Sequence, residues 1–194
     1  TAITELTVLA PDHPRLLATL TGACAAAGAN IAGAQIFTTA DGIALDTLLI
    51  QREFAQAADE ERRAERVASL IRQALKGKVR LRELVASASR PRGRISSFTV
   101  EPRVIVDNES SNRTTVIEVN GLDRIGLLYD LTHALFRLNL NIASAHIATY
   151  GERAVDVFYV TDLTGEKITH ANRRNAIVRH LMQVLQPEAE AKAG

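Results

Sequence analysis

The sequence predicts an α+β protein made of two βαββαβ modules in tandem, each an antiparallel sheet with its helices on one face. Two observations predict this fold. Residues 12–40 and 123–151 align without a gap at an offset of 111 residues, with 12 identities in 29 positions. Both copies also show the same succession of strand-like and helix-like apolar patterns. A repeat of this length indicates a duplicated domain, because the units of solenoid proteins run only ~20 to 50 residues.

The composition suits two small domains and argues against several classes of protein. With 46% apolar residues and no tryptophan, the chain must build its core from Leu, Ile, Val and Ala. The net charge of +1 gives no general attraction to nucleic acid or to a membrane, and we find no signal peptide and no apolar run of membrane-spanning length. Cys24 is the only cysteine, which favours a reducing, cytoplasmic setting. The first residue is Thr rather than Met, so we expect a piece of a longer protein.

The first module shows clear helix boundaries between its strands. Asp12 is expected as the N-cap of the first helix, with Pro14 in the first turn, where a missing N–H does no harm. That helix ends at Gly28. Asp59 is expected to cap the second helix, which ends at Gly77. The expected strands, read from β-branched and alternating apolar residues, are 3–10, 30–39 and 43–51.

The stretch between the modules is less regular. Residues 78–102, with scattered Ser and Arg, are expected to be a linker region, within which residues 78–85 alternate and indicate a short strand. Residues 103–107 are a better strand candidate, and we expect them to close the first sheet as its fourth strand. The first domain is therefore predicted to comprise residues 1–77 together with this strand.

The second domain, residues 108–194, repeats the order. After its last helix only a short polar tail remains, so this copy lacks a clear fourth strand, and its open sheet edge needs cover from a swapped strand, a neighbouring chain or further domains. Both modules thus follow the ferredoxin-like split βαβ order. The elements expected in this domain are strands at 114–119, 141–149 and 154–161 and helices at 127–138 and 171–185.

Several chemistries are disfavoured by missing motifs. The sequence contains no GxSxG, GxGxxG or GxxxxGK[ST], which are typical of nucleophile elbows and of dinucleotide and triphosphate loops. The five histidines show no HExxH or HxxxH spacing, so we expect no metal site. Phe158 and Tyr159 are adjacent in a strand and point to opposite faces, which argues against the aromatic platform of RNA-recognition modules.

The loop before the first helix of each module is the most informative feature. In the second copy, GLDRIG at residues 121–126 places two glycines around a helix start, where unpaired N–H groups and the helix dipole attract a carboxylate. Gly126 removes a side chain where a small ligand would approach the backbone. The alternative is that Asp123 only caps the helix and that the glycines only make a turn. The residues alone leave both interpretations open.

An asparagine opens the second strand of each copy, Asn30 in the first and Asn141 in the second. Such a residue either bonds a turn or offers its carboxamide, which both donates and accepts hydrogen bonds, to another amide across a groove.

The motifs GLDRIGLL and NIASAHIAT, followed by a turn and a short apolar strand with an acidic residue, resemble an ACT domain, a regulatory module that binds amino acids. The whole pair, with SSFTVEPRVIVDNESSNRTTVIEV between the copies, is similar to the C-terminal tandem of the family of bifunctional PII uridylyltransferase/uridylyl-removing enzymes. This resemblance covers nearly the whole chain.

The resemblance implies a parent nucleotidyltransferase that attaches uridylyl groups to the PII protein when glutamine is scarce and removes them when it is plentiful. Its catalytic domains, for which magnesium is expected, lie N-terminal to the tandem, and L-glutamine is the implied effector. This chain has no His-Asp dipeptide and no GS…DxD pattern, so we expect no catalytic residue and no cofactor within it. A homo-oligomer is compatible with this family. Neither nucleic acid nor membrane is an expected partner.

The loops and the resemblance together imply where glutamine binds. The carboxylate is expected at the start of a first helix, near Asp123 to Gly126, with Asn141, or Asn30 from a facing module, holding the polar groups and Asp12 or Asp123 receiving the ammonium. The first copy has His13-Pro14-Arg15 in place of Arg124-Ile125-Gly126, so the second loop is the better site. The expected ligand-binding residues are Asp123, Arg124, Ile125, Gly126, Leu127, Asn141, Ile142, Asp12, His13, Arg15, Asn30 and Ile31.

Three other functions are compatible with parts of the sequence. An ACT tandem could sense another amino acid in a different regulated enzyme, such as a biosynthetic enzyme or a stress-response synthetase. A module without a ligand could dock on catalytic domains or on PII. The third alternative is RNA binding through Arg90, Arg92 and Arg94, although a solvated linker explains these residues better.

Overall fold

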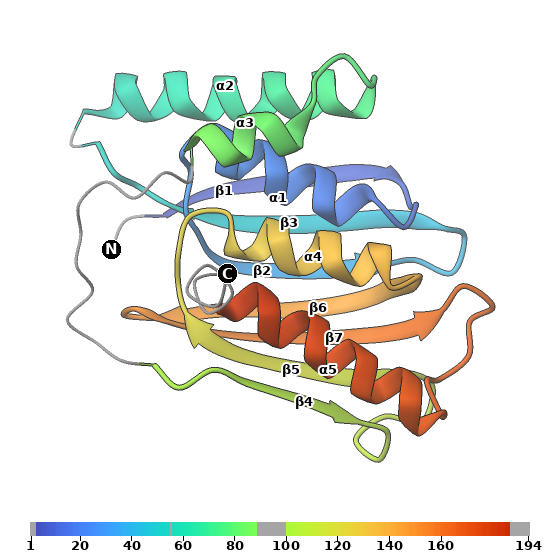
Figure 1. Cartoon of the computed structure of the whole chain (residues 1–194). Coiled ribbons are helices and arrows are strands. Elements are labelled where there is room, and N and C mark those ends of the chain that lie inside the picture. Colours follow the sequence, from blue (N-terminus) through green and yellow to red (C-terminus); the bar gives the residue numbers. More distant parts are fainter. Residues whose placement is uncertain (1–2, 55, 89–99, 187–194) are drawn as a thin grey trace.

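A computed structural model describes residues 3–54, 56–88 and 100–186. Seven strands form one antiparallel sheet in the order β1-β3-β2-β6-β7-β5-β4, and the helices cover one face of it (Figure 1). The strands are β1 (Ile3–Pro11), β2 (Ile31–Thr38), β3 (Ile43–Gln51), β4 (Arg103–Asp107), β5 (Thr115–Leu122), β6 (Leu140–Tyr150) and β7 (Arg153–Asp162). The helices are α1 (Leu16–Ala26), α2 (Ala57–Leu75), α3 (Leu81–Ala88), α4 (Leu127–Arg137) and α5 (Ala171–Leu185).

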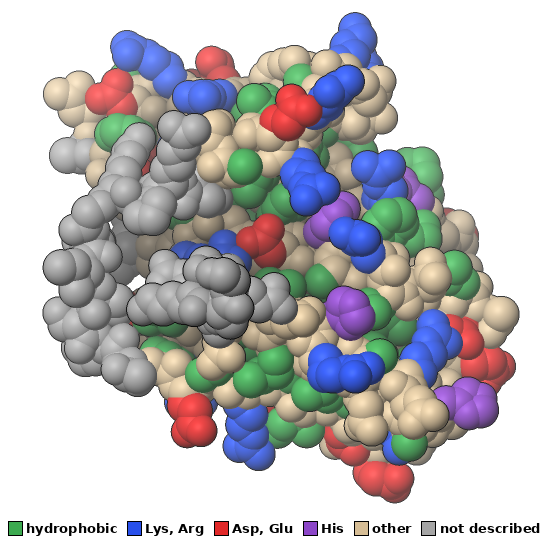
Figure 2. Space-filling view, viewed as in Figure 1, with side chains coloured by type: hydrophobic (Ala, Val, Ile, Leu, Met, Phe, Trp, Pro, Cys, Tyr) green, Lys and Arg blue, Asp and Glu red, His purple; other side chains and the backbone are tan. Residues whose placement is uncertain are grey.

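The predicted α+β class and the two repeated modules are confirmed. Within each module, every second residue of the strands points toward the helices, and most of these side chains are apolar. Leu, Ile and Val side chains of the helices pack into the same core. The opposite face of the sheet carries no helix in the described part of the chain, and charged side chains are spread over the helix-covered face (Figure 2). None of the helices that the structure describes is long and apolar enough to cross a membrane.

Three local predictions are wrong. Asp12 does not cap α1, because the helix begins later and Arg15 occupies the N-cap position without a side-chain cap. Asp59 lies in the first turn of α2 rather than before it, and Gln56 is the N-cap. Residues 81–88, within the expected linker, form helix α3 rather than continuing a strand. Its buried Val85 packs against Ala25 of α1, so this segment is part of the helix layer.

The pairing predicted for residues 103–107 is also wrong. This strand, β4, pairs with β5 of the second module, with Arg103 opposite Asn120 and Asp107 opposite Val116. The second module therefore has its fourth strand, which precedes its first strand in the chain, and the first module has three strands with β1 at the open edge. The physical reason is local: a short turn at 108–114 joins β4 to β5 as a hairpin, and short loops cost less entropy to close than long ones.

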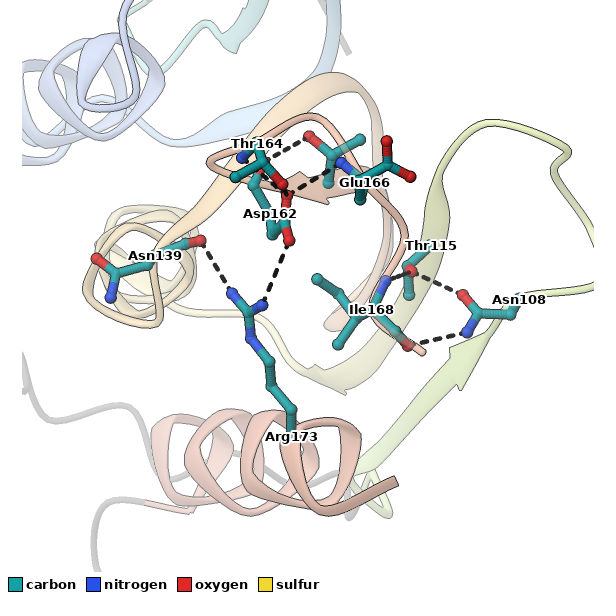
Figure 3. A network of polar contacts seen from close by, with 9 residues as sticks. Asn108, Thr115, Asn139, Asp162, Thr164, Glu166, Ile168 and Arg173 are labelled. Carbon is teal, nitrogen blue, oxygen red and sulfur yellow. Dashed lines mark hydrogen bonds and ion pairs between the residues drawn. The ribbon is translucent and has the colours of Figure 1, made fainter. Parts of the chain in front are cut away.

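A polar network fixes the end of β4 to the second module (Figure 3). The Asn108 side chain accepts a hydrogen bond from the Thr115 hydroxyl at 2.7 Å and donates one to the Ile168 carbonyl at 2.9 Å. The Ile168 N–H in turn donates to the Thr115 oxygen at 2.8 Å. Nearby, Arg173 of α5 forms an ion pair with Asp162 at the end of β7. These contacts tie β4, β5 and α5 together as one unit.

The two modules share one sheet and one core. Strand β2 pairs with β6 so that Gln35 faces His146, its own equivalent at the 111-residue offset. On the helix side, the Thr21 and Thr132 hydroxyls lie 3.1 Å apart, and these residues are also separated by 111 positions. Because equivalent residues meet on both layers, a local two-fold axis relates the modules.

Candidate functional site

A small cleft lies where the α4 loop of the second module meets the beginning of β2 in the first. This arrangement places Asn30 of one module against the Asp123 loop of the other, as expected for a facing pair. The free space measures about 20 Å³, enough for roughly one water molecule. The residues lining it are Thr21, Ala25, Ala29, Asn30, Ile31, Asp123, Arg124, Gly126, Leu128 and Tyr129.

Asn30 and Asp123 connect the modules directly. The Asn30 side-chain amide donates to the Asp123 carboxylate at 3.3 Å and, at the same distance, to the side-chain Oε1 of Gln51. Asp123 is not a helix cap, since its backbone N–H donates to the Glu152 carbonyl at 2.8 Å and its carboxylate faces Asn30. The interpretation of this aspartate as a cap alone is therefore wrong.

Gly126 is the N-cap of α4 and adopts a left-handed conformation with φ of 86°. Residues with a Cβ are strained in this region, so the turn itself requires glycine. No side chain caps α4. The Leu127 N–H donates to the Arg124 carbonyl at 3.0 Å. The donors that an anionic group would meet here, together with the positive end of the helix dipole, are therefore the N–H groups of the next two residues of the first turn.

A second carboxyl group lies behind Asp123. Asp156 of β7 is only 2% exposed, and its Oδ1 atom has no hydrogen-bond partner in the described part of the chain. Burial raises the pKa of Asp156 to about 7, the Asp123 charge adds to this, and a backbone hydrogen bond from Ala148 opposes it. Burial also raises the pKa of Asp123, against the lowering effects of Asn30 and Arg124. The cleft thus has one carboxyl group in its lining, Asp123, and a second behind it, Asp156, and Arg124 is the one cation among its described lining residues.

The local two-fold axis creates a second version of this site. There Asp12 accepts a hydrogen bond from the Thr38 hydroxyl at 3.1 Å, and the buried Asp46 stands where Asp156 stands in the other copy. Burial raises the pKa of Asp46 to about 7, and the charge of Asp12 raises it further. Among the described residues, Asn141 makes no hydrogen bond to Asp12, so the contact between modules is not repeated.

Bulky side chains fill this second site. The open cleft is lined by Gly126 and Ala25, and their equivalents at the 111-residue offset are Arg15 and Phe136. The Arg15 guanidinium lies 5.5 Å from the centre of the Phe136 ring, whereas the equivalent positions of the open cleft have only the Gly126 backbone and the Ala25 methyl group. The loop at 123–126 therefore has more free space beside it than the loop at 12–15, which favours it as the binding site.

The other expected site residues are distributed around these two positions. Arg124 lines the open cleft but forms an ion pair with Asp130 at 2.7 Å. Leu127 is buried in the core, and Ile125 packs beside the cluster of Ala25, Val85 and Tyr129. The remaining residues lie as follows: Ile31 lines the open cleft, Ile142 packs against the core beside Asn141, and the His13 ring accepts the Arg15 N–H.

Asp156 was not among the expected site residues. The signal that predicts it is the alignment of Asp46 with Asp156, because an acidic residue on the core-facing side of an apolar strand in both copies is costly unless it has a role. No group of three or more potential metal ligands occurs among the described residues.

Comparison with known proteins gives two family matches. Residues 4–72 match the family model described as the ACT domain, and residues 110–192 match the model described as the ACR family N-terminal ACT domain. Together the two matches take in most of the chain and coincide with the two modules of the structure.

Among curated proteins, the chain is 57% identical over 183 residues to a bifunctional uridylyltransferase/uridylyl-removing enzyme of Nitrobacter hamburgensis. The alignment covers 94% of this chain and 20% of the relative, so the chain spans about a fifth of that protein. Among solved structures, it is similar to an unknown protein from Galdieria sulphuraria, with 16% identity, a TM-score of 0.27 and coverage of 97% of this chain and 92% of the other. That structural likeness is too weak to carry an argument.

Proposed function

The chain belongs to the ACT-domain family, and from this premise we propose that it is the glutamine-sensing region of an enzyme that uridylylates and deuridylylates the PII signalling protein. The observation that carries the proposal is the cleft between the modules, where the Asn30 amide contacts the Asp123 carboxylate beside an uncapped helix. The similarity to the Nitrobacter enzyme supports the identity of the parent protein.

Each polar group of glutamine has a complementary group in this cleft. The α-ammonium would bind between Asp123 and Asp156, where two carboxyl groups lie close together. The α-carboxylate would accept hydrogen bonds from N–H groups at the beginning of α4. The side-chain amide would pair with the Asn30 carboxamide, which both donates and accepts hydrogen bonds. A glutamate side chain would instead bring a third negative charge toward the two aspartates.

Binding requires the cleft to open. Room of about 20 Å³ does not accommodate an amino acid, so the ligand must separate Asn30 from Asp123 and take over their hydrogen bonds. These residues belong to different modules, and their separation changes how the modules meet. Glutamine therefore favours one arrangement of the tandem, and only this difference in affinity between arrangements can switch activity.

The switch acts on catalytic domains elsewhere in the parent protein. We infer that these domains precede the tandem, carry the transferase and uridylyl-removing activities and hold the magnesium that the reaction needs. A coupling free energy of ~1 to 3 kcal/mol between glutamine binding and the domain arrangement is sufficient for a several-fold to hundred-fold change in activity.

Calorimetric titration of the purified chain with L-glutamine tests the proposal, with L-glutamate and L-asparagine as ligand controls. Asn30→Ala should weaken glutamine binding ~10-fold, because it removes a paired amide contact in which each neutral hydrogen bond contributes roughly 0.5 to 1.5 kcal/mol. Asn141→Ala is the matched control, since it removes the equivalent side chain from the filled site and should leave the affinity unchanged. Absence of heat with glutamine from a folded sample, or equal losses in both variants, would contradict the proposal.

A further inference from the structure

A second, larger hollow lies on the helix face, away from the strand ends. It has a volume of about 730 Å³, within the range of small-molecule sites, and is bounded by α1, α4, α3 and the end of α2. Its polar lining is dominated by cationic and imidazole side chains: His13, Arg15, Arg80, Arg82 and His133. We refer to this hollow as the basic groove.

The positive charge of the basic groove is poorly neutralised. Among the described residues, Glu83 is the only acidic one in its lining, and it pairs with Arg80 at 3.2 Å. Both side chains of this pair are well exposed, at 85% for Arg80 and 68% for Glu83, so the pair is weak in water. Arg15 and Arg82 form no ion pair among the described residues. Figure 2 shows Lys, Arg and His side chains gathered on this helix-covered side.

Aromatic rings form one wall of the groove. The Tyr129 and His133 rings are stacked, with centroids 5.6 Å apart and planes 20° from parallel. Gly22 makes room for this wall, because a Cβ at that position would lie 2.8 Å from the Tyr129 ring. The wall is therefore held in place by the close approach of α1 and α4.

The electrostatics at His133 reflect the same surplus of charge. Burial lowers the pKa of His133, and the nearby charges of Arg137, Arg82 and Arg15 lower it further, against a smaller effect of Asp130. An anion bound among these arginines would reverse that effect and stabilise the protonated imidazole.

We propose that the basic groove binds a phosphate-bearing small molecule, with Arg15, Arg80 and Arg82 on the phosphate oxygens and His133 beside the rest of the ligand. Guanidinium groups match phosphate geometry with paired hydrogen bonds. Tyr129 is buried and His133 lies between the Tyr129 and Phe136 rings, so the wall offers the partly exposed edge of His133, beside the apolar Val79 and Leu81 of the lining, to the organic part of a ligand. A nucleotide would use this apolar contact and an inorganic polyphosphate would not. A bounded hollow suits a small molecule better than an extended polyanion.

This site goes beyond the amino-acid sensor and connects to it. Arg15, Arg80 and Arg82 belong to the first module and its following helix, whereas His133 belongs to α4 of the second. A ligand in the groove would therefore touch both modules on the helix side. Tyr129 lines both the groove and the cleft. Binding of one ligand would therefore change the affinity for the other through the contact between α1 and α4.

The test is calorimetric titration of the purified chain with ATP, UTP and inorganic tripolyphosphate. We expect saturable binding at one ligand per chain. Arg82→Gln should weaken it ~10-fold or more, since each charged hydrogen bond contributes roughly 1.5 to 3 kcal/mol. Arg62→Gln, which removes the same charge from the exposed start of α2, should bind as the unaltered chain does. Nucleotides binding more tightly than tripolyphosphate would identify the ring wall as part of the site.

A second readout separates a site from general charge attraction. The imidazole pKa of His133, followed by NMR, should rise on saturation with the ligand and should not rise in Arg82→Gln. Equal weakening by Arg62→Gln, no saturable binding of any of the three compounds, or binding only of RNA or acidic protein would overturn the proposal. Glutamine titration of Arg82→Gln should give the unaltered affinity, so failure here does not bear on the sensor.

Discussion

The hydroxyl groups of Thr21 and Thr132 form a hydrogen bond across the local two-fold axis, with their oxygens 3.1 Å apart. Each residue is almost fully buried, and each hydroxyl also reaches a carbonyl one turn earlier in its own helix, Leu17 for Thr21 and Leu128 for Thr132. The contact joins α1 to α4 at the point where the modules meet. It also lies at the edge of the cleft between the modules, which Thr21 lines.

We predict that Thr21→Val and Thr132→Val each lower the free energy of unfolding by ~0.5 to 1.5 kcal/mol. In each single variant the remaining hydroxyl still donates to the carbonyl one turn earlier in its own helix, so no buried donor is left without an acceptor. The double variant should lose less than the sum of the single losses, because the shared hydrogen bond is removed only once. Urea unfolding of the four proteins gives this coupling energy. Strict additivity would contradict a direct bond between the hydroxyls.

The sequence predicts most elements of this fold because their apolar periodicity is strong. Strand 43–51 and helix 171–185 have the expected bounds, since alternation and 3.6-residue spacing report directly on which face is buried. The pairing of β4 was not predictable from the repeat. A duplication implies that each copy has its fourth strand after its second helix. Residues 103–107 instead pair with β5, the strand that follows them after a short turn.

The candidate site was predictable only in part. Asn30 and Asp123 carry a visible signal, because each repeat has an asparagine and an aspartate at matching positions, and Asp123 is also flanked by glycines. The alignment with Asp46 marks Asp156 as an unusual acidic residue in an apolar strand, but it does not reveal that the Oδ1 atom lies without a hydrogen-bond partner among the described residues. The basic groove is harder still. Its arginines come from helices whose mutual placement no periodicity encodes.

A buried ion pair fixes the connection between β3 and α2. The Glu60 carboxylate accepts the N–H groups of Glu53 and Phe54 at 2.6 and 2.8 Å and pairs with Arg63 at 2.9 Å. Arg63 also donates to the Gln51 carbonyl. We predict that Glu60→Ala lowers the free energy of unfolding by ~3 to 5 kcal/mol, because it leaves two N–H groups without their acceptor and the buried Arg63 guanidinium with only the half-exposed Glu53, at 3.5 Å, as a charged partner.

The neighbouring residue provides the control for that prediction. Glu61 is exposed and lies next to Glu60 on α2, so Glu61→Ala changes the same charge without breaking a buried pair. Its effect on denaturant unfolding should stay within ~0.5 kcal/mol. Equal losses in the two variants would show that helix charge, rather than the buried pair, governs stability here.

The buried acids Asp46 and Asp156 should make the protein less stable as the pH rises toward 7. Their pKa values are raised from 3.8 to about 7 in the folded state. Between these limits the folded chain binds more protons than the unfolded chain, so the free energy of unfolding falls with increasing pH. At 1.36 kcal/mol per pKa unit, the loss reaches at most ~4 kcal/mol per group, fully developed above about pH 7. Below about pH 4 other carboxyl groups reverse the trend, because hydrogen bonds lower the pKa of Asp107 and Asp162.

We therefore predict that Asp156→Asn flattens the fall in stability between about pH 4 and 7. The same substitution should raise the melting temperature at pH 8, because the neutral Asn side chain replaces a buried ionised carboxylate. The measurement is thermal unfolding across this range, with Asp59→Asn, an exposed aspartate on α2, as the control that should keep the full slope. If glutamine binds at the cleft as proposed, its ammonium should partly restore stability at pH 8 in the unaltered chain, because it would neutralise the ionised pair of Asp123 and Asp156. The restoration should be smaller in Asp156→Asn. An unchanged pH slope in that variant would show that Asp156 titrates normally and would remove it from the site.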